Sequence, residues 1–79
     1  MNEFKGKRVT VMGLGLNQGG LGIAKWLVRH GARLTITDLK TKEQLAPSIA
    51  ALAEVKGHPV RYVLGRHRNE DFRRADMII

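Results

Sequence analysis

The chain has 79 residues, a formal net charge of +7 and no cysteine. This length corresponds to one small domain or part of a larger one, and the composition excludes disulfides, thiolate zinc sites and cysteine nucleophiles. No apolar run reaches the roughly 18 residues of a membrane span, and the N-terminus has no signal-peptide pattern. We therefore expect a cytoplasmic chain without a membrane partner.

The positive charge makes nucleic acid a partner to consider. However, the fourteen Lys and Arg residues are scattered, and the aromatic content of 5% is too low for a base-stacking platform. A basic nucleic-acid-binding module is therefore a third hypothesis, supported by charge alone, and we expect no nucleic-acid partner.

The first half of the chain alternates between strand and helix patterns. Residues 9–12 form a short apolar, β-branched run, and residues 34–37 alternate with period two before Asp38, so both are predicted strands. Between them, apolar residues recur at helical spacing over 20–30, and Gly31 is the expected C-cap.

The second half repeats the alternation. A helix is predicted to begin near Ala46, with Pro47 in its first turn, where proline is tolerated. Residues 60–64 are a predicted strand, residues 69–75 a short helix capped by its own first residue, and residues 77–79 the start of a fourth strand.

The order β-α-β-α-β-α-β predicts an α/β fold with a parallel sheet and right-handed crossovers. A finished domain rarely stops within an apolar strand such as 77–79. We therefore expect residues 1–79 to be one fragment of a longer protein, truncated in the fourth strand.

Five glycines lie between positions 13 and 22, in the connection from a predicted strand to a predicted helix. Such a loop can bind phosphate through free N–H groups at the helix N-terminus. The G-x-G-x-x-G fingerprint of dinucleotide-binding loops is not met strictly, because its third glycine would fall at Gln18. The loop is not a P-loop either, because Leu21-Gly22 stands in place of Lys-Ser/Thr. A tight turn without a ligand is the alternative.

Asp38 ends a predicted strand at the same sheet edge, 23 positions after Gly15. Near this spacing an acidic residue contacts a ribose or base in nucleotide-binding sheets. We expect an exposed carboxylate that binds a nucleoside; a carboxylate that only caps the following turn is the alternative. Loop and acid together predict a nucleotide site.

No catalytic arrangement can be assembled from the remaining residues. His67 stands near Glu70 and Asp71, but no second histidine stands at ligand spacing. We expect these residues to form a solvated loop and helix start, and we expect no metal site.

Several segments form a series that extends over nearly the whole chain: Phe4-Lys5-Gly6-Lys7-Arg8-Val9 before Gly13-Leu14-Gly15, then Gly31-Ala32, Thr35-Ile36-Thr37-Asp38-Leu39-Lys40, and Gly65-Arg66-His67-Arg68-Asn69-Glu70-Asp71-Phe72 before Ala75-Asp76-Met77-Ile78-Ile79. This series resembles the N-terminal domain of the Mur ligases, which build peptidoglycan precursors in the cytoplasm, and most closely the branch that adds D-glutamate.

The resemblance implies a Rossmann-like domain over residues 1–79 that holds the UDP part of UDP-N-acetylmuramoyl-L-alanine. It implies that the UDP-binding residues are Gly15, Leu16, Asn17, Gln18, Gly19 and Gly20 for the diphosphate, and Asp38, Leu39 and Lys40 for the uracil. ATP, Mg²⁺ and D-glutamate are implied for the central and C-terminal domains of the same protein, so the fragment alone is expected to be inactive.

The main alternative is an NAD(P)-binding half-domain of an oxidoreductase, because the same loop and acid support it. Lys40, close after Asp38, would even suit a 2′-phosphate. A Ser-Pro-Gly segment and then a P-loop further along the chain would favour the ligase.

Overall fold

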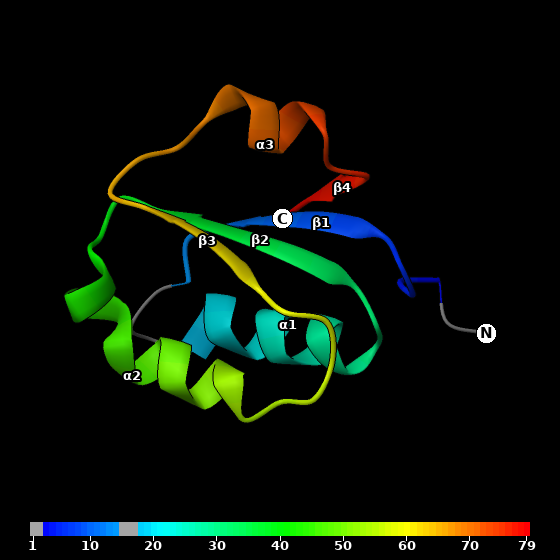
Figure 1. Cartoon of the computed structure of the whole chain (residues 1–79), viewed down its shortest axis with the longest axis horizontal. Coiled ribbons are helices and arrows are strands. Elements are labelled where there is room, and N and C mark those ends of the chain that lie inside the picture. Colours follow the sequence, from blue (N-terminus) through cyan, green and yellow to red (C-terminus); the bar gives the residue numbers. More distant parts are fainter. Residues whose placement is uncertain (1–2, 15–17) are drawn as a thin grey trace.

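The computed structural model describes residues 3–14 and 18–79, which form a parallel sheet with helices on both faces (Figure 1). The strands, in the spatial order β3-β2-β1-β4, are β1 (Arg8–Met12), β2 (Arg33–Asp38), β3 (Arg61–Leu64) and β4 (Met77–Ile78). The helices are α1 (Gln18–Arg29), α2 (Lys42–Ala53) and α3 (Asn69–Arg73). The predicted α/β fold and its alternation of elements are confirmed.

The core lies between the sheet and the two longer helices. Alternate residues of β1 and β2 are apolar and face α1 and α2, since successive side chains of a strand point to opposite faces. The buried apolar side chains of this layer are Val9, Val11, Leu34 and Ile36 from the strands, Ala24, Leu27 and Val28 from α1, and Leu45 and Leu52 from α2. The short helix α3 lies on the opposite face (Figure 1).

The end of α1 follows the prediction closely. Gly31 has φ +82°, and its N–H donates to the Val28 carbonyl at 3.0 Å, while the Ala32 N–H donates to the Leu27 carbonyl at 3.1 Å. These two bonds form the Schellman pattern, which needs a left-handed residue that glycine supplies without strain. Gly31 is therefore the C-cap that the sequence predicts.

The predicted start of α2 near Ala46 is wrong, because the helix begins at Lys42. Thr41 is the N-cap: the Gln44 N–H donates to Thr41 Oγ1 at 3.3 Å, and the Thr41 N–H donates to Gln44 Oε1 at 2.9 Å. This reciprocal capping box fixes the first turn. Pro47 lies inside the helix and is exposed, so its ring is tolerated at the cost of one helical hydrogen bond.

Two smaller differences concern the C-terminal part. Helix α3 is capped by Arg68, which precedes the expected residue and makes no side-chain capping bond, and the helix ends at Arg73. Strand β4 pairs with β1 in parallel, with Val9 opposite Met77, and the Met12 N–H donates to the Ile79 carbonyl at 2.8 Å. The predicted fourth strand is confirmed, and the pairing places it next to the first.

Candidate functional site

The carboxyl ends of β1, β2 and β3 meet at one edge of the sheet, because all three strands run parallel (Figure 1). Gly13 follows β1 with φ +87°, and its N–H donates to the Thr37 carbonyl of β2 at 2.7 Å. In parallel α/β sheets this is the edge where ligands bind. The structure thus brings the beginning of the glycine loop next to the end of β2, as the sequence predicts.

The expected phosphate-binding residues lie before and at the start of α1. Gly15, Leu16 and Asn17 lie outside the described residues, and Gln18 and Gly19 are described only as the first two residues of α1. The N–H groups of a first helical turn have no partners within the helix and can bind an anion. No acidic residue stands in the first turn of α1 to oppose one.

Gly20 allows α1 to approach the end of β1 very closely. A Cβ at this position would stand 2.6 Å from the Leu14 carbonyl oxygen, and it would also overlap the carbonyl oxygen of Gly13. This is the packing role that the third glycine has in the dinucleotide fingerprint. The strict fingerprint would place this glycine at position 18, but here it stands two positions later, at Gly20.

Asp38 is not the exposed carboxylate that was expected. It is 6% exposed; its Oδ2 accepts from the Leu14 N–H at 3.0 Å, and its Oδ1 accepts from the Lys40 N–H at 2.9 Å. The side chain is buried because the connection after β1 passes over the end of β2 and supplies a donor. Asp38 therefore connects the start of the glycine loop to the turn after β2, and it caps that turn. Its contact with a nucleoside stays a prediction.

The turn after β2 is also held from the side of β3. The N–H of Gly65, with φ +78°, donates to the carbonyls of Asp38 at 2.8 Å and Lys40 at 3.1 Å. Leu39, between them, is 68% exposed, and Lys40 is exposed as well. The backbone of this turn is fixed by hydrogen bonds among Asp38, Lys40 and Gly65. It presents the side chains of residues 39 and 40 at the sheet edge.

His67 belongs to the same edge, although it was expected only to lie in a solvated loop. The residue is exposed, but its Nδ1 lies 2.8 Å from Oγ1 of the fully buried Thr37. This contact fixes the segment after β3 on the end of β2. The position of residues 65–67 directly after a strand was the signal that could have placed them here, because parallel strands end at one edge.

Asp71 pairs with arginines. Its side chain is 1% exposed and lies 3.0 Å from a guanidinium nitrogen of Arg68 and of Arg61. The hydrogen bond from Arg68, helped by the charge of Arg61, holds the pKa of Asp71 below its ordinary value. The prediction of a solvated helix start is wrong for this residue. Within residues 3–14 and 18–79, no three His, Cys, Asp or Glu residues are grouped as a metal ion would need.

None of the helices that the structure describes is long and apolar enough to span a membrane.

Residues 7–79 match the model of the family described as "Mur ligase MurD-like, N-terminal domain".

Curated relatives agree with this match. The chain is 48% identical over 77 residues to the UDP-N-acetylmuramoylalanine--D-glutamate ligase of Roseiflexus sp. (strain RS-1), covering 98% of this chain and 16% of that protein. It is 46% identical over 79 residues to the ligase of the same name from Borreliella afzelii (strain PKo), covering 100% of this chain and 17% of that protein. The one from Treponema pallidum (strain Nichols) is 45% identical over 77 residues, covering 96% and 14%. The chain thus spans about one sixth of the length of these relatives and belongs to the MurD-like N-terminal domain family of the Mur ligases.

Proposed function

We propose that this chain binds the UDP part of UDP-N-acetylmuramoyl-L-alanine at the carboxyl edge of its sheet. The observation that carries the proposal is the pair of hydrogen bonds from Leu14 and Lys40 to Asp38, which joins the glycine loop and the turn after β2 into one backbone frame. The relatives' names support the choice of ligand, since each is called a UDP-N-acetylmuramoylalanine--D-glutamate ligase.

The diphosphate is assigned to the glycine loop, from Gly15 to Gly20. The N–H groups of the first turn of α1 have no partners within the helix, and the positive end of the helix dipole lies there; both favour phosphate oxygens. The absence of a side chain at Gly20 keeps this helix end against the end of β1. A phosphate bound there would therefore lie within the same edge as the turn after β2.

The uracil is assigned to Asp38, Leu39 and Lys40. The exposed Leu39 side chain offers apolar surface to a flat base, and the exposed Lys40 offers a positive charge. Asp38 holds the backbone of this turn in place through the bond from the Lys40 N–H to its Oδ1.

For the full-length protein, we propose an ATP-dependent ligase of the cytoplasm that joins D-glutamate to this substrate in peptidoglycan synthesis. Leu21-Gly22 stands where a P-loop has Lys-Ser/Thr, so we assign ATP and Mg²⁺ to the central domain and D-glutamate largely to the C-terminal domain. The chain alone would then supply substrate binding and no turnover.

Amide NMR titrations with UDP, NADH and NADPH test this assignment against an oxidoreductase half-domain. UDP is expected to shift the amides of residues 13–20 and 38–40 at lower concentration than either nicotinamide. Lys40→Ala is expected to weaken UDP binding, whereas Lys56→Ala, an equal loss of charge at another exposed lysine, is expected to leave it unchanged. Equal or tighter binding of NADH or NADPH would contradict the proposal.

A further inference from the structure

The face of the sheet opposite α1 and α2 is polar. Residues Arg8 and Thr10 of β1, Arg33 and Thr35 of β2, and Arg61 of β3 all line this face. Parallel strands that are covered on both faces are almost continuously apolar, but these strands alternate between apolar and polar residues. The second face is therefore suited to a polar partner rather than to an apolar helix.

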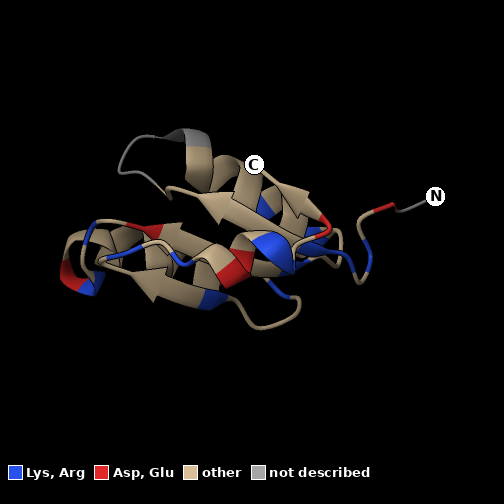
Figure 2. Ribbon diagram, turned by 90° about the horizontal axis from the view of Figure 1, so that it is seen from above, with Lys and Arg blue, Asp and Glu red and all other residues tan. Residues whose placement is uncertain are grey.

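Helix α3 covers only part of this face. Thr10 Oγ1 donates to the Asp71 carbonyl at 2.7 Å, which fixes α3 above β1. Beside the helix lies a cavity of about 300 Å³ over the first halves of β1, β2 and β3. Figure 2, which looks onto this face, shows basic segments on the helix above the sheet and on the strands beside it.

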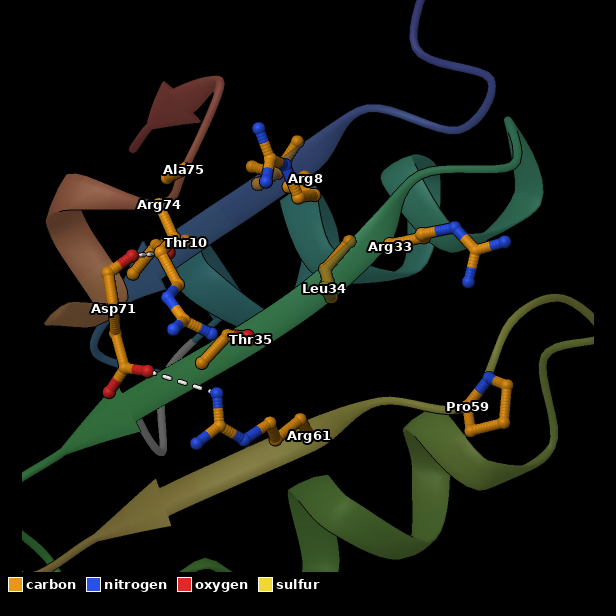
Figure 3. A pocket seen from close by; sticks show the side chains of 11 residues that line it. Arg8, Thr10, Arg33, Leu34, Thr35, Pro59, Arg61, Asp71, Arg74 and Ala75 are labelled. Carbon is orange, nitrogen blue, oxygen red and sulfur yellow. Dashed lines mark hydrogen bonds and ion pairs between the residues drawn. The ribbon is translucent and has the colours of Figure 1, made fainter.

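Four arginines line the cavity: Arg8, Arg33, Arg61 and Arg74 (Figure 3). One carboxylate, that of Asp71, lines it with them, and it is shared between Arg61 and Arg68, each at 3.0 Å. Arg8 pairs with Asp76 at 3.3 Å. Positive charge thus exceeds negative charge around this cavity.

Two of these arginines have unused donors. The side chains of Arg33 and Arg74 form no hydrogen bond or ion pair with the described residues. Arg74 extends from the end of α3 over the sheet toward Thr35 (Figure 3). Thr35 is half-buried, and its hydroxyl has no hydrogen-bond partner in the described part of the chain. The guanidinium groups of Arg61 and Arg74 and the Thr35 hydroxyl thus lie at one end of the cavity, whereas the Arg33 side chain extends away from them (Figure 3).

We propose that this cavity, named here the arginine cavity, binds a phosphate group, either as free phosphate or carried by a small molecule. The planar fork of a guanidinium matches a phosphate bidentately, and charge-assisted hydrogen bonds are about twice as strong as neutral ones. The arginine cavity opens beside the first residues of the strands, whereas the proposed UDP site lies where the strands end. The two sites are separate, so this inference does not rest on the proposed function.

The test is an NMR titration of the chain with inorganic phosphate, glucose 6-phosphate and, at matched ionic strength, acetate. Saturable shifts are expected at Thr35, Arg61 and Arg74 with the two phosphate compounds. Saturation by inorganic phosphate alone assigns free phosphate, and tighter binding of glucose 6-phosphate assigns a carried group. Acetate that saturates the same residues equally well would overturn the choice of phosphate.

Arg74→Gln and Arg73→Gln form a matched pair. Both remove one exposed positive charge at the end of α3, but only Arg74 lines the cavity. Arg74→Gln is expected to weaken phosphate binding about tenfold, the effect of losing a charge-assisted hydrogen bond, and Arg73→Gln less than twofold. Equal weakening by both variants would reduce the effect to diffuse charge attraction and overturn the site. An absence of saturable shifts at these residues would overturn it too.

Discussion

Replacing Asp38 by Asn tests whether the sheet edge depends on its buried carboxylate. Both carboxylate oxygens accept backbone N–H groups, at 3.0 Å from Leu14 and 2.9 Å from Lys40. An amide retains one oxygen, so one of these two donors would face an NH₂ group. Hydrogen bonds to charged groups contribute about 1.5–3 kcal/mol, and an unsatisfied buried donor costs about 1–3 kcal/mol. Because the turn at Lys40 is open to water, we expect a loss of about 2 kcal/mol.

This loss is large for a chain of 79 residues. Domains of this size are stable by roughly 4–12 kcal/mol, and 2 kcal/mol changes the folding equilibrium about thirtyfold. Urea unfolding followed by circular dichroism measures it as a lower transition midpoint at unchanged slope. Glu54→Gln is the control, because Glu54 is exposed at the end of α2, and we expect a change below about 0.5 kcal/mol there.

UDP affinity is then measured on Asp38→Asn at a temperature where the variant is fully folded. We expect UDP binding to be about tenfold weaker, because the variant disturbs the backbone frame and removes a charged acceptor. A variant as stable as the wild type would refute the argument that the carboxylate holds the edge together. Unchanged UDP affinity per folded molecule would leave Asp38 a structural residue only.

Three further predictions concern stability and association. The hydrogen bond with Arg68 lowers the pKa of Asp71 from 3.8, so the contribution of the Asp71 carboxylate to folding stability is complete above pH 3.8 and is lost as the pH falls through the folded-state pKa. The urea midpoint of Asp71→Asn should therefore be lower than that of the wild type at pH 7 and converge with it in acid, and a constant difference would contradict this. In thermal unfolding, Gly20→Ala should destabilise the fold by about 1–3 kcal/mol, because the new methyl group overlaps the Leu14 carbonyl, whereas Gly22→Ala, with open space around it, should stabilise α1 by about 0.5–1 kcal/mol. Equal effects of the two variants would contradict the close approach of α1 to the end of β1. The apolar side chain of Ile78, 50% exposed on β4, should promote self-association in sedimentation runs at rising concentration, and Ile78→Lys should reduce it; a monomer at every concentration would contradict that prediction.

Local patterns predicted most of the secondary structure. The apolar alternation of β2 and the left-handed cap at Gly31 depend on neighbouring residues alone, so the sequence contains them in full. The start of α2 was misplaced because Pro47 was given more weight than the capping box of Thr41 and Gln44, which is equally local. That error was avoidable from the sequence.

The site depends on contacts that no local pattern contains. The position of Asp38 at the end of a predicted strand placed it at the correct sheet edge. Its burial, however, comes from Leu14, which lies 24 residues earlier, covers the end of β2 and donates its N–H to the carboxylate. The contact of His67 with Thr37 spans 30 residues, and the pairing of Asp71 with Arg61 spans 10. Such contacts depend on the spatial order of the strands, β3-β2-β1-β4, and on the paths of the connecting segments, which the order of elements along the chain does not give. The arginine cavity was missed for the same reason, since its four arginines are scattered in the sequence and converge only in the fold.

The most direct test of the UDP site is the set of intermolecular nuclear Overhauser effects between bound UDP and the labelled chain. We expect contacts from the uracil H5 and H6 protons to the side chains of Leu39 and Lys40, and from the ribose to amides of residues 13–20. Uracil contacts with Thr35, Arg61 or Arg74 instead, or none at the carboxyl edge at saturating UDP, would contradict it.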